Sequence, residues 1–386
     1  MVTEAVKGFR DIENIQAERK LVIRNIIEEV FRVYGFNPTE TPIIEQEEFV
    51  KGNNSNDEAV SEIFKLQDRG ERKLALRYEF TFQLKRLAQN KKLPYKRYQI
   101  GEVFRDEPVT SNRWRQFTQC DADIIGSGNK DEAEILQIAS EILDKLGLKF
   151  TININNRKLL NEILEKAGIK EKDRIEVIKE IDKLDKLSEK EVKENLKKYG
   201  AEKVLDIFKK KEKDFEKYQF YSEIKTLKEA CNLYGLETRF QPTLARGLSY
   251  YNGSVFEIKI QEMKETISAG GSYLVNGIQS TGISFGLDRL EVLAKLKTVS
   301  KNVLIISLGE DKKSIELANK IRKNKTPTLV MYGKISKALE YANSSGISYS
   351  IFIGEEEVKK KKFKLRDMKT GKEEMLSEKE IIERLS

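Results

Sequence analysis

The feature that most constrains this chain is a long helical stretch that separates two regions with strand patterning. Residues 158–236 contain no proline and only three glycines, and Leu and Ile recur three and four positions apart among many Lys and Glu. This spacing is typical of amphipathic helices. Short apolar runs typical of strands occur before this stretch and return at residue 238. The sequence therefore predicts one sheet, built from both sides of a helical insertion.

The regions on either side of the insertion predict an α+β domain. Apolar residues at helical spacing predict a helix over 13–34, which Gly35 ends. Strands are predicted at 74–77, 98–104, 115–125, 148–155, 238–241, 254–260 and 269–277, helices at 81–89 and 130–146, and a strand that runs into a helix at 282–293. The polar segment 105–114 makes the second and third of these strands a long hairpin. We predict an antiparallel sheet domain over 1–157 and 237–297, interrupted by a helical insertion domain over 158–236.

The C-terminal part predicts a separate α/β domain over residues 298–386. Strands at 303–308, 329–332 and 349–353 alternate with helices at 312–322 and 334–342, which indicates a partly parallel sheet. The last 86 residues hold 19 Lys and Arg against 13 Asp and Glu, and so carry six of the chain's eight net positive charges. A compact basic domain suits a polyanion partner. The run Lys359–Lys362, taken alone, is better explained as a solvated turn.

Composition excludes several classes of protein. The 386 residues include no histidine, so Ser-His-Asp, Cys-His and HExxH chemistries are ruled out. The two cysteines, Cys120 and Cys231, form no CxxC pair, and we expect each to be a small buried hydrophobic residue. No apolar run approaches the roughly 18 residues of a membrane span, and the N-terminus lacks a signal-peptide core. We expect a cytoplasmic protein and, if it is an enzyme, one that works through carboxylates, cations, positioned phosphates or Mg²⁺.

One group of residues could carry chemistry in the predicted hairpin. Alternate residues of paired strands share a face, so Arg105, Gln119 and Asp123 could line one floor while Arg113 reaches in from the loop. Guanidinium groups bind phosphate bidentately, and two of them at this spacing suit a nucleoside triphosphate. A surface hairpin with solvated arginines would show the same spacing, and the pattern alone leaves both possibilities open.

The residues around this hairpin resemble the class II aminoacyl-tRNA synthetases. The segment Phe104-Arg-Asp-Glu107, with Arg113 and then Arg115-Gln-Phe117, resembles motif 2 of that class. Residues 282–290 resemble motif 3, and Pro42 after a long helix resembles the dimer-forming motif 1. The three motifs stand in the order of the class.

The subtype follows from further segments. Residues 244–257 and 269–273 resemble the two signature segments of histidyl-tRNA synthetases, and residues 7–12 resemble that family's N-terminal entry. Residues 76–81 match its Arg-x-Glu-x-Thr element, and residues 155–160 match its approach to the insertion. The resemblance, to an archaeal-like member, covers nearly the whole chain. It implies histidine activation with ATP and Mg²⁺, transfer to tRNA(His), an anticodon-binding C-terminal domain and a homodimer, without a membrane.

For ATP, the resemblance implies specific roles for arginines and one carboxylate. Arg105 would hold the α-phosphate and the carboxylate of the amino acid, and Arg246 would be a second catalytic arginine at the α-phosphate. Arg113 and Arg289 would bind the β- and γ-phosphates, which Mg²⁺ shares, and Glu107 would face the adenine. An ordinary helix-start arginine paired with Asp288 is the alternative for Arg289.

For histidine, the resemblance implies a pocket that reads both ends of the amino acid. The α-ammonium would be received by Glu79, Thr81 and Gln119. The two imidazole nitrogens would bind Asp123 and Tyr251, and the pocket walls would be Tyr250 and Tyr273. The alternative for the two wall tyrosines is aromatic core. The insertion would clamp the acceptor arm of tRNA with its lysines, or would simply be a solvated helical bundle.

Some positions depart from the family pattern. The loop 109–112 lacks the usual Gln and Gly, Asp123 stands where many members carry Glu, Ser249 replaces an Asp, and Ser272 with Leu274 replace Arg and Asp. Two other functions share this layout. A non-catalytic paralogue that acts as a regulatory or tRNA-binding module would generally lose the arginines that are present here. Class II enzymes for threonine, proline or glycine lack the segment that follows Arg246.

Overall fold

The computed structural model describes residues 3–52, 58–110, 113–185, 187–245, 250–260, 266–296 and 302–385. The chain divides into two compact units, Met1–Leu296 and Lys297–Ser386. Each unit is described by itself below. Among the helices in the described ranges, none is long and apolar enough to cross a membrane.

The first unit is built on an eight-stranded sheet with the order β1-β5-β6-β11-β10-β9-β7-β8. Its strands are β1 (Asn37–Pro38), β5 (Tyr95–Phe104), β6 (Gln116–Ile125), β7 (Phe150–Asn156), β8 (Thr238–Phe240), β9 (Tyr251–Ile260), β10 (Thr266–Val275) and β11 (Ile278–Gly286). The two outer pairs, β1 with β5 and β7 with β8, are parallel, and the other pairs are antiparallel. A parallel pair needs a crossover connection. The helical insertion supplies it, because it joins β7 to β8.

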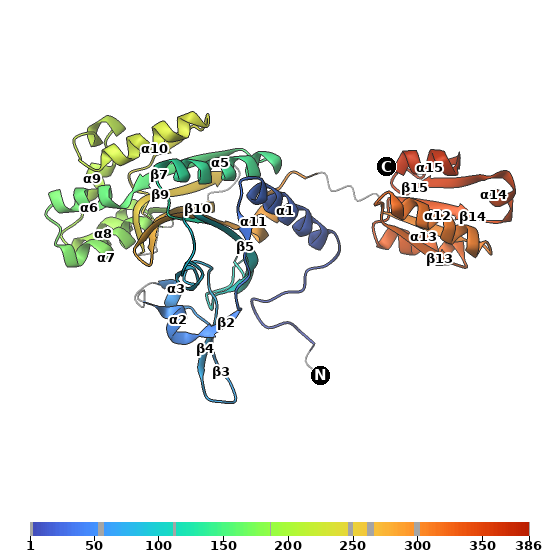
Figure 1. The fold of residues 1–386 in the computed structure, drawn as a ribbon, viewed down its shortest axis with the longest axis horizontal. Coiled ribbons are helices and arrows are strands. Elements are labelled where there is room, and N and C mark those ends of the chain that lie inside the picture. The colour runs from blue at the N-terminus through green and yellow to red at the C-terminus, as the bar shows by residue number, and fades with distance from the viewer. Residues whose placement is uncertain are drawn as a thin grey trace. The chain divides into compact units, whose positions relative to one another are not determined.

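Helices cover one face of this sheet. Helix α1 (Asn14–Val33) contacts α5 (Asn129–Lys145) and α11 (Leu287–Leu293), each of the three contacts strands of the sheet, and α1 and α5 lie along one side of the sheet in Figure 1. The buried residues of α1 are Ile23, Ile27, Val30 and Phe31, at the spacing that puts them on one stripe. The helix ends at Val33, and Gly35, two residues beyond, has a φ of +79° that favours glycine. The prediction of a helix over 13–34 is confirmed.

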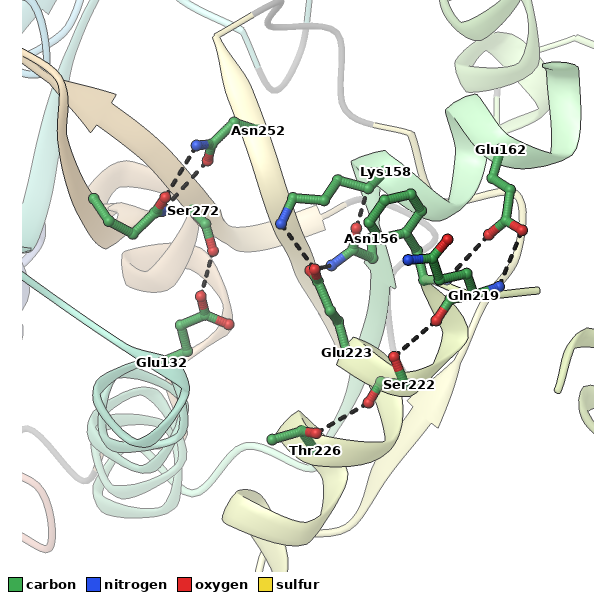
Figure 2. Close-up of polar contacts among 12 residues, drawn as sticks. Glu132, Asn156, Lys158, Glu162, Gln219, Ser222, Glu223, Thr226, Asn252 and Ser272 are labelled. Carbon is green, nitrogen blue, oxygen red and sulfur yellow. Dashed lines mark hydrogen bonds and ion pairs between the residues drawn. The ribbon is translucent and has the colours of Figure 1, made fainter. Parts of the chain in front are cut away.

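The insertion is helical, as predicted. It contains α6 (Arg157–Lys166), α7 (Glu171–Asp182), α8 (Glu189–Lys197), α9 (Val204–Phe208), α10 (Tyr221–Leu233) and two short 3₁₀ helices, η1 (Lys183–Asp185) and η2 (Glu212–Phe215). Figure 2 shows how its first and last helices are joined. The Asn156 Nδ2 and Lys158 Nζ atoms donate to the two carboxylate oxygens of Glu223 at 2.7 and 2.8 Å. The carboxylate of Glu162 accepts from the backbone N–H groups of Gln219 and Phe220, both at 3.0 Å.

A small sheet lies on the opposite side of the main sheet from α1 and α5 (Figure 1). It has the order β2-β4-β3, formed by β2 (Ile44–Gln46), β3 (Lys65–Gln67) and β4 (Lys73–Leu76), with α2 (Glu47–Lys51) and α3 (Glu58–Ser61) beside it. The helix predicted over 81–89 is wrong in extent, because only α4 (Leu84–Leu87) is helical. Several hydrogen bonds there span three residues, such as Leu84 N to Thr81 O at 3.0 Å, and this tighter turn does not propagate.

The second unit is an α/β domain. Its sheet has the order β13-β12-β14-β15-β16, with the first three strands parallel and the last two antiparallel. The elements are β12 (Val303–Ser307), α12 (Asp311–Lys323), β13 (Thr328–Tyr332), α13 (Ile335–Ser344), β14 (Tyr349–Ile353), α14 (Glu355–Lys360), β15 (Lys362–Asp367), β16 (Glu373–Ser377) and α15 (Glu378–Leu385). The basic run Lys359–Lys362 is solvent-exposed at the end of α14, so it is solvated as expected.

The predicted fold class is confirmed in both units. The antiparallel sheet resumes after the insertion, and the C-terminal sheet is partly parallel. The expectation for the cysteines also holds, since Cys120 and Cys231 are free and fully buried. The strands β9 and β10 begin at Tyr251 and Thr266, three residues earlier than predicted, because the two strands pair with each other over these residues although polar residues interrupt the apolar alternation there.

Candidate active site

The face of the sheet opposite the helices is polar although it is largely buried. On β6 the side chains alternate: Cys120, Ala122 and Ile124 belong to the hydrophobic core under the helices, which leaves Gln119, Asp121 and Asp123 on the other face. All three are buried, with exposed fractions of 7%, 4% and 4%. Burial of three polar side chains on one strand is costly unless each finds partners, so their partners define the site.

Asp123 is held by residues from two neighbouring strands. The register places it opposite Arg97 on β5 and opposite Gly282 on β11. The Arg97 Nη2 atom lies 2.8 Å from Asp123 Oδ2, and Arg97 is fully buried. The hydroxyl of Tyr273 donates to Asp123 Oδ1. Burial raises the pKa of Asp123, while the Arg97 charge and the Tyr273 hydrogen bond oppose that rise.

A glycine leaves the space that this carboxylate occupies. A Cβ atom at position 282 would lie 2.1 Å from Asp123 Oδ1, so only a residue without a side chain fits opposite Asp123. Gly270 is equally confined, because its Cβ would lie 2.0 Å from the carbonyl oxygen of Gly282. Gly270, in a signature-like segment, and Gly282, in the motif 3-like segment, therefore let three strands and a buried carboxylate approach closely.

Arg105 joins the polar face through Gln119. Its Nη2 atom donates to Gln119 Oε1 at 3.3 Å, its Nε atom donates to the Tyr78 carbonyl at 3.2 Å, and its guanidinium lies 5.1 Å from the ring centroid of Phe117. On its other side, Gln119 Nε2 donates to both oxygens of Asp121, at 3.1 and 3.2 Å. The predicted floor of Arg105, Gln119 and Asp123 is present.

Glu79 and the tyrosines form the next part of the site. Burial raises the pKa of Glu79 to about 8; the nearby Arg105 charge opposes the rise, and the charges of Asp121 and Asp123 add to it. Thr81 hydrogen-bonds the hydroxyl of Tyr250, whose pKa burial raises well above its usual value. The Tyr250 ring lies 4.7 Å from that of Tyr251 and 5.6 Å from that of Tyr273, between centroids.

The two predicted wall residues, Tyr250 and Tyr273, are packed with Tyr251 in or against a small hydrophobic cluster. Tyr251 and Tyr273 belong to a small buried cluster with Leu84, Ile125 and Val255, so they are packed as aromatic core. The hydroxyl of Tyr273 nevertheless reaches the carboxylate of Asp123. Aromatic side chains with an apolar body and a polar tip can do both.

The remaining arginines lie at the ends of the same strands. Arg113 in the hairpin loop pairs with Glu107, Nη1 to Oε2 at 3.2 Å, and its side chain is 42% exposed. Arg289, in the first turn of α11, donates from Nη1 to the carbonyl of Thr266 at 2.7 Å. Asp288 binds Arg10, Lys20 and the backbone N–H of Thr118 at 3.1, 3.0 and 2.8 Å. The two phosphate-binding candidates are thus presented from the loop and from the strand-to-helix junction.

One predicted catalytic residue is not placed. Arg246 lies outside the described residues, as do Ser249 and the loop positions 111–112. Among the described residues, no group of three or more His, Cys, Asp or Glu could hold a metal ion.

Sequence reasoning missed three residues of the buried polar face: Arg97, Asp121 and Ser284. The signal was available, because Arg97 and Gln99 on β5 alternate with core residues just as Gln119, Asp121 and Asp123 do on β6. Ser284 pairs with Asp121 in the register of β11 and β6. Polar residues at alternate positions on both strands of one hairpin indicate a polar face, and following that pattern across the hairpin would have found the first two.

Comparison with known proteins decides the family. A family model described as "Histidyl-tRNA synthetase" matches residues 8–290, and one described as "Anticodon binding domain" matches residues 302–386. The chain belongs to the histidyl-tRNA synthetase family. It is 34% identical to histidine–tRNA ligase 2 of Shouchella clausii over 96% of this chain and 97% of that protein. It is also 34% identical to histidine–tRNA ligase 1 of Bacillus cereus, over 95% and 96% of the two chains.

A solved structure agrees with these relatives. The crystal structure of histidyl-tRNA synthetase from Nostoc sp. PCC 7120 superimposes with a TM-score of 0.86 at 25% identity, covering 100% of this chain and 99% of that one. The family resemblance, the class II fold and the ligase class predicted from the sequence are therefore confirmed. The comparisons do not favour the non-catalytic paralogue. An archaeal-like character stays a prediction.

Proposed function

We propose that this protein activates histidine with ATP and transfers it to the 3′ end of tRNA(His). In the first step a carboxylate oxygen of histidine attacks the α-phosphorus of ATP, and pyrophosphate leaves. In the second step a ribose hydroxyl of the tRNA attacks the carbonyl carbon of the adenylate, and AMP leaves. The observation that carries the proposal is the buried polar face in a member of this family. This face joins Arg105 through Gln119 to an acidic end formed by Asp121 and Asp123.

The two ends of this face suit the two ends of the reaction. Arg105 is proposed to bind the α-phosphate and the histidine carboxylate, and so to stabilise negative charge as the phosphorus becomes pentavalent. Arg246 is proposed as a second cation at the α-phosphate. Positioned cations accelerate in-line attack by a carboxylate without a protein base, which is consistent with a chain that lacks histidine.

The acidic end is proposed to select histidine. Glu79, Thr81 and Gln119 would receive the α-ammonium, and Asp123 and Tyr251 would hydrogen-bond the two imidazole nitrogens. A carboxylate offers about four acceptor positions, so Asp123 can keep Arg97 and Tyr273 and still accept from an imidazole N–H. A buried site built for such hydrogen bonds rejects analogues that leave its groups unpaired. Tyr250 and Tyr273 are proposed as the pocket walls.

The ATP tail is proposed to lie between the loop and α11. Arg113 and Arg289 would bind the β- and γ-phosphates, and Glu107, now paired with Arg113, would turn toward the adenine. Mg²⁺ is proposed to enter as the MgATP complex, because this ion keeps several waters and is usually held by substrate phosphates with one or two carboxylates.

The other parts of the chain are proposed to handle tRNA and the second subunit. We propose a catalytic domain over 1–157 and 237–297, an insertion domain over 158–236 and an anticodon-binding domain over 298–386. The groove between α6 and α10 has a volume of about 1120 Å³ and is lined by lysines and glutamates alike. Its lysines support contact with the acceptor arm, while the glutamates also fit a solvated bundle. A homodimer through the motif 1 region and a cytoplasmic location are proposed from the family.

ATP–pyrophosphate exchange tests the activation step. Purified protein is assayed with MgATP and each standard amino acid in turn, and exchange is expected with histidine alone. Arg105→Ala should abolish it. Arg239→Ala, which removes an exposed arginine of β8, serves as the matched control and should leave it unchanged. A folded protein that binds ATP or tRNA but exchanges with no amino acid would instead be the non-catalytic paralogue.

A further inference from the structure

Among the proposed histidine-binding side chains that the structure describes, only Gln119 ends in a carboxamide, which can point either its oxygen or its nitrogen at the ligand. A carboxamide has an acceptor and a donor of almost the same size, and the two exchange places when the group flips. In one orientation Oε1 faces Arg105 and the proposed position of the α-ammonium. In the other, an N–H donor would face two cations, which is repulsive. Productive binding of histidine therefore needs the first orientation.

The neighbours of Gln119 fix that orientation from both sides. A guanidinium can only donate, so Arg105 Nη2, at 3.3 Å, requires an acceptor. An ionised carboxylate can only accept, so Asp121 Oδ1 and Oδ2, at 3.1 and 3.2 Å, require the Nε2 donor. The Ser284 hydroxyl accepts from the same Nε2 atom at 3.0 Å. Both hydrogens of the amide are thus used on the side away from Arg105.

Asp121 is placed to hold the Gln119 carboxamide. It lies two residues from Gln119 on the same face of β6, and it is 4% exposed. Burial and the nearby Asp123 charge raise the pKa of Asp121 to about 6, while the Arg97 charge and the hydrogen bonds to Ser284 and Gln119 oppose that rise, so this carboxyl is mostly ionised at pH 7. Burying a carboxylate costs free energy unless its hydrogen bonds are satisfied, and the hydrogen bonds to Gln119 supply such partners.

We propose that Asp121 is a positioning residue that, with Ser284, locks the Gln119 carboxamide with Oε1 toward Arg105 and the bound amino acid. The inference rests on the proposed function, since it deepens the proposed role of Gln119 in amino-acid binding. Asp121 does not touch the substrate; it acts through Gln119. Its loss should therefore affect the binding of histidine and leave that of ATP nearly unchanged.

The experiment compares Asp121→Asn and Asp121→Ala with the unaltered protein in ATP–pyrophosphate exchange. In Asp121→Asn the new amide can donate to Gln119 and so allows the flipped orientation, without a change of size. The KM for histidine is expected to rise about tenfold in both variants, the cost of one misplaced buried hydrogen bond. The KM for ATP should stay within about twofold, since Arg105 keeps its hydrogen bond to the Tyr78 carbonyl and Arg113 and Arg289 are unaltered.

A reversed pair separates positioning from a merely structural role. In the double variant Gln119→Glu/Asp121→Asn, the carboxylate and the amide exchange places. The new carboxylate at position 119 presents only acceptors to Arg105, and the new amide at position 121 donates a hydrogen bond to that carboxylate. This double variant should recover most of the histidine KM lost in Asp121→Asn, which a structural defect would not do. Asp144→Asn, at an exposed position of α5, is the matched control. Thermal unfolding of every variant identifies any that does not fold.

The outcomes distinguish this inference from the proposed function. If the unaltered protein exchanges with histidine and the Asp121 variants keep its KM for histidine, the positioning role is wrong while the function stands. Equal increases in the KM for histidine and for ATP, or no recovery in the reversed pair, would also overturn it. Absence of exchange in the unaltered protein contradicts the proposed function itself. Should Asp121→Ala fail to fold, Asp121→Asn and Ser284→Ala carry the same test, the latter with a smaller increase.

Discussion

Binding of histidine should release a proton from Glu79, and this release should control how affinity depends on pH. Burial raises the pKa of Glu79 to about 8 in the ligand-free site, so about one carboxyl in ten is ionised at pH 7. An α-ammonium placed beside Glu79 favours the charged form and lowers this pKa. Below pH 8, therefore, the carboxyl must lose its proton as histidine binds.

The size of the effect follows from the pKa. If Glu79 is fully ionised in the complex, affinity rises about tenfold for each pH unit well below 8, and about fiftyfold between pH 6 and pH 8. The variant Glu79→Gln keeps the size and one acceptor of the side chain but cannot ionise. The imidazole of free histidine also titrates in this range, but it does so equally for both proteins. The ratio of the two Kd values therefore isolates Glu79.

Isothermal titration calorimetry measures both quantities. Histidine is titrated into each protein at pH 6, 7 and 8, in buffers of different ionisation enthalpy, which gives Kd and the number of protons released. At pH 7 the unaltered protein should release about 0.9 proton more than Glu79→Gln. A Kd ratio that stays constant across this pH range, with equal proton release, would refute the reasoning and place the ammonium elsewhere.

The same pKa has a consequence for stability. The carboxyl of Glu79 ionises near its ordinary pKa of 4.5 in the unfolded chain but only near 8 in the folded one. Between these values the folded chain binds more protons, so the free energy of unfolding contributed by this group falls as pH rises. Urea unfolding should show that Glu79→Gln gains stability over the unaltered protein between pH 5 and pH 8; a constant difference would contradict the buried, protonated state.

Two further predictions concern the packing of the site and are checked by urea unfolding. Arg97→Met leaves Asp123 as an unpaired buried charge and should cost about 3–5 kcal/mol of unfolding free energy at pH 8; adding Asp123→Asn should restore most of it, and no recovery would show that the cost is not electrostatic. Gly270→Ala should cost about 1–3 kcal/mol or more, because the new Cβ lies 2.0 Å from the carbonyl oxygen of Gly282. Gly128→Ala, whose Cβ would lie 3.9 Å from its nearest neighbour, is the control; equal losses in both would show that the effect is not steric.

Much of the fold could be predicted because it depends on local periodicity. The helix of α1, the hairpin of β5 and β6 and the helical insertion each follow from the spacing of apolar residues over a few turns. The small sheet β2-β4-β3 was not fully predicted, because β2 and β3 are three residues long and mostly exposed. Such strands carry little hydrophobic alternation, and their pairing comes from contact with β4.

The candidate site also has a part that could be predicted from the sequence and a part that could not. Arg105, Gln119 and Asp123 could be placed together because a hairpin brings alternate residues of adjacent strands onto one face. Asp121 carried the same signal on the same strand, but its task depends on the direction of the hydrogen bonds around Gln119. Such directions cannot be read from residue types alone, because a carboxamide can serve either way.

By itself, the sequence determined which residue types are available and how they alternate, and these properties settled most of the longer helices and strands, the absence of histidine chemistry and the family motifs. Only the tertiary structure decided that Asp123 pairs with Arg97 and Tyr273, that Asp288 binds Arg10 and Lys20 rather than serving only its own helix, and that Glu79 is buried deeply enough to hold its proton. The physical reason is that partners and pKa values depend on strand register and on distance from water. Both are set by contacts between segments far apart in the chain.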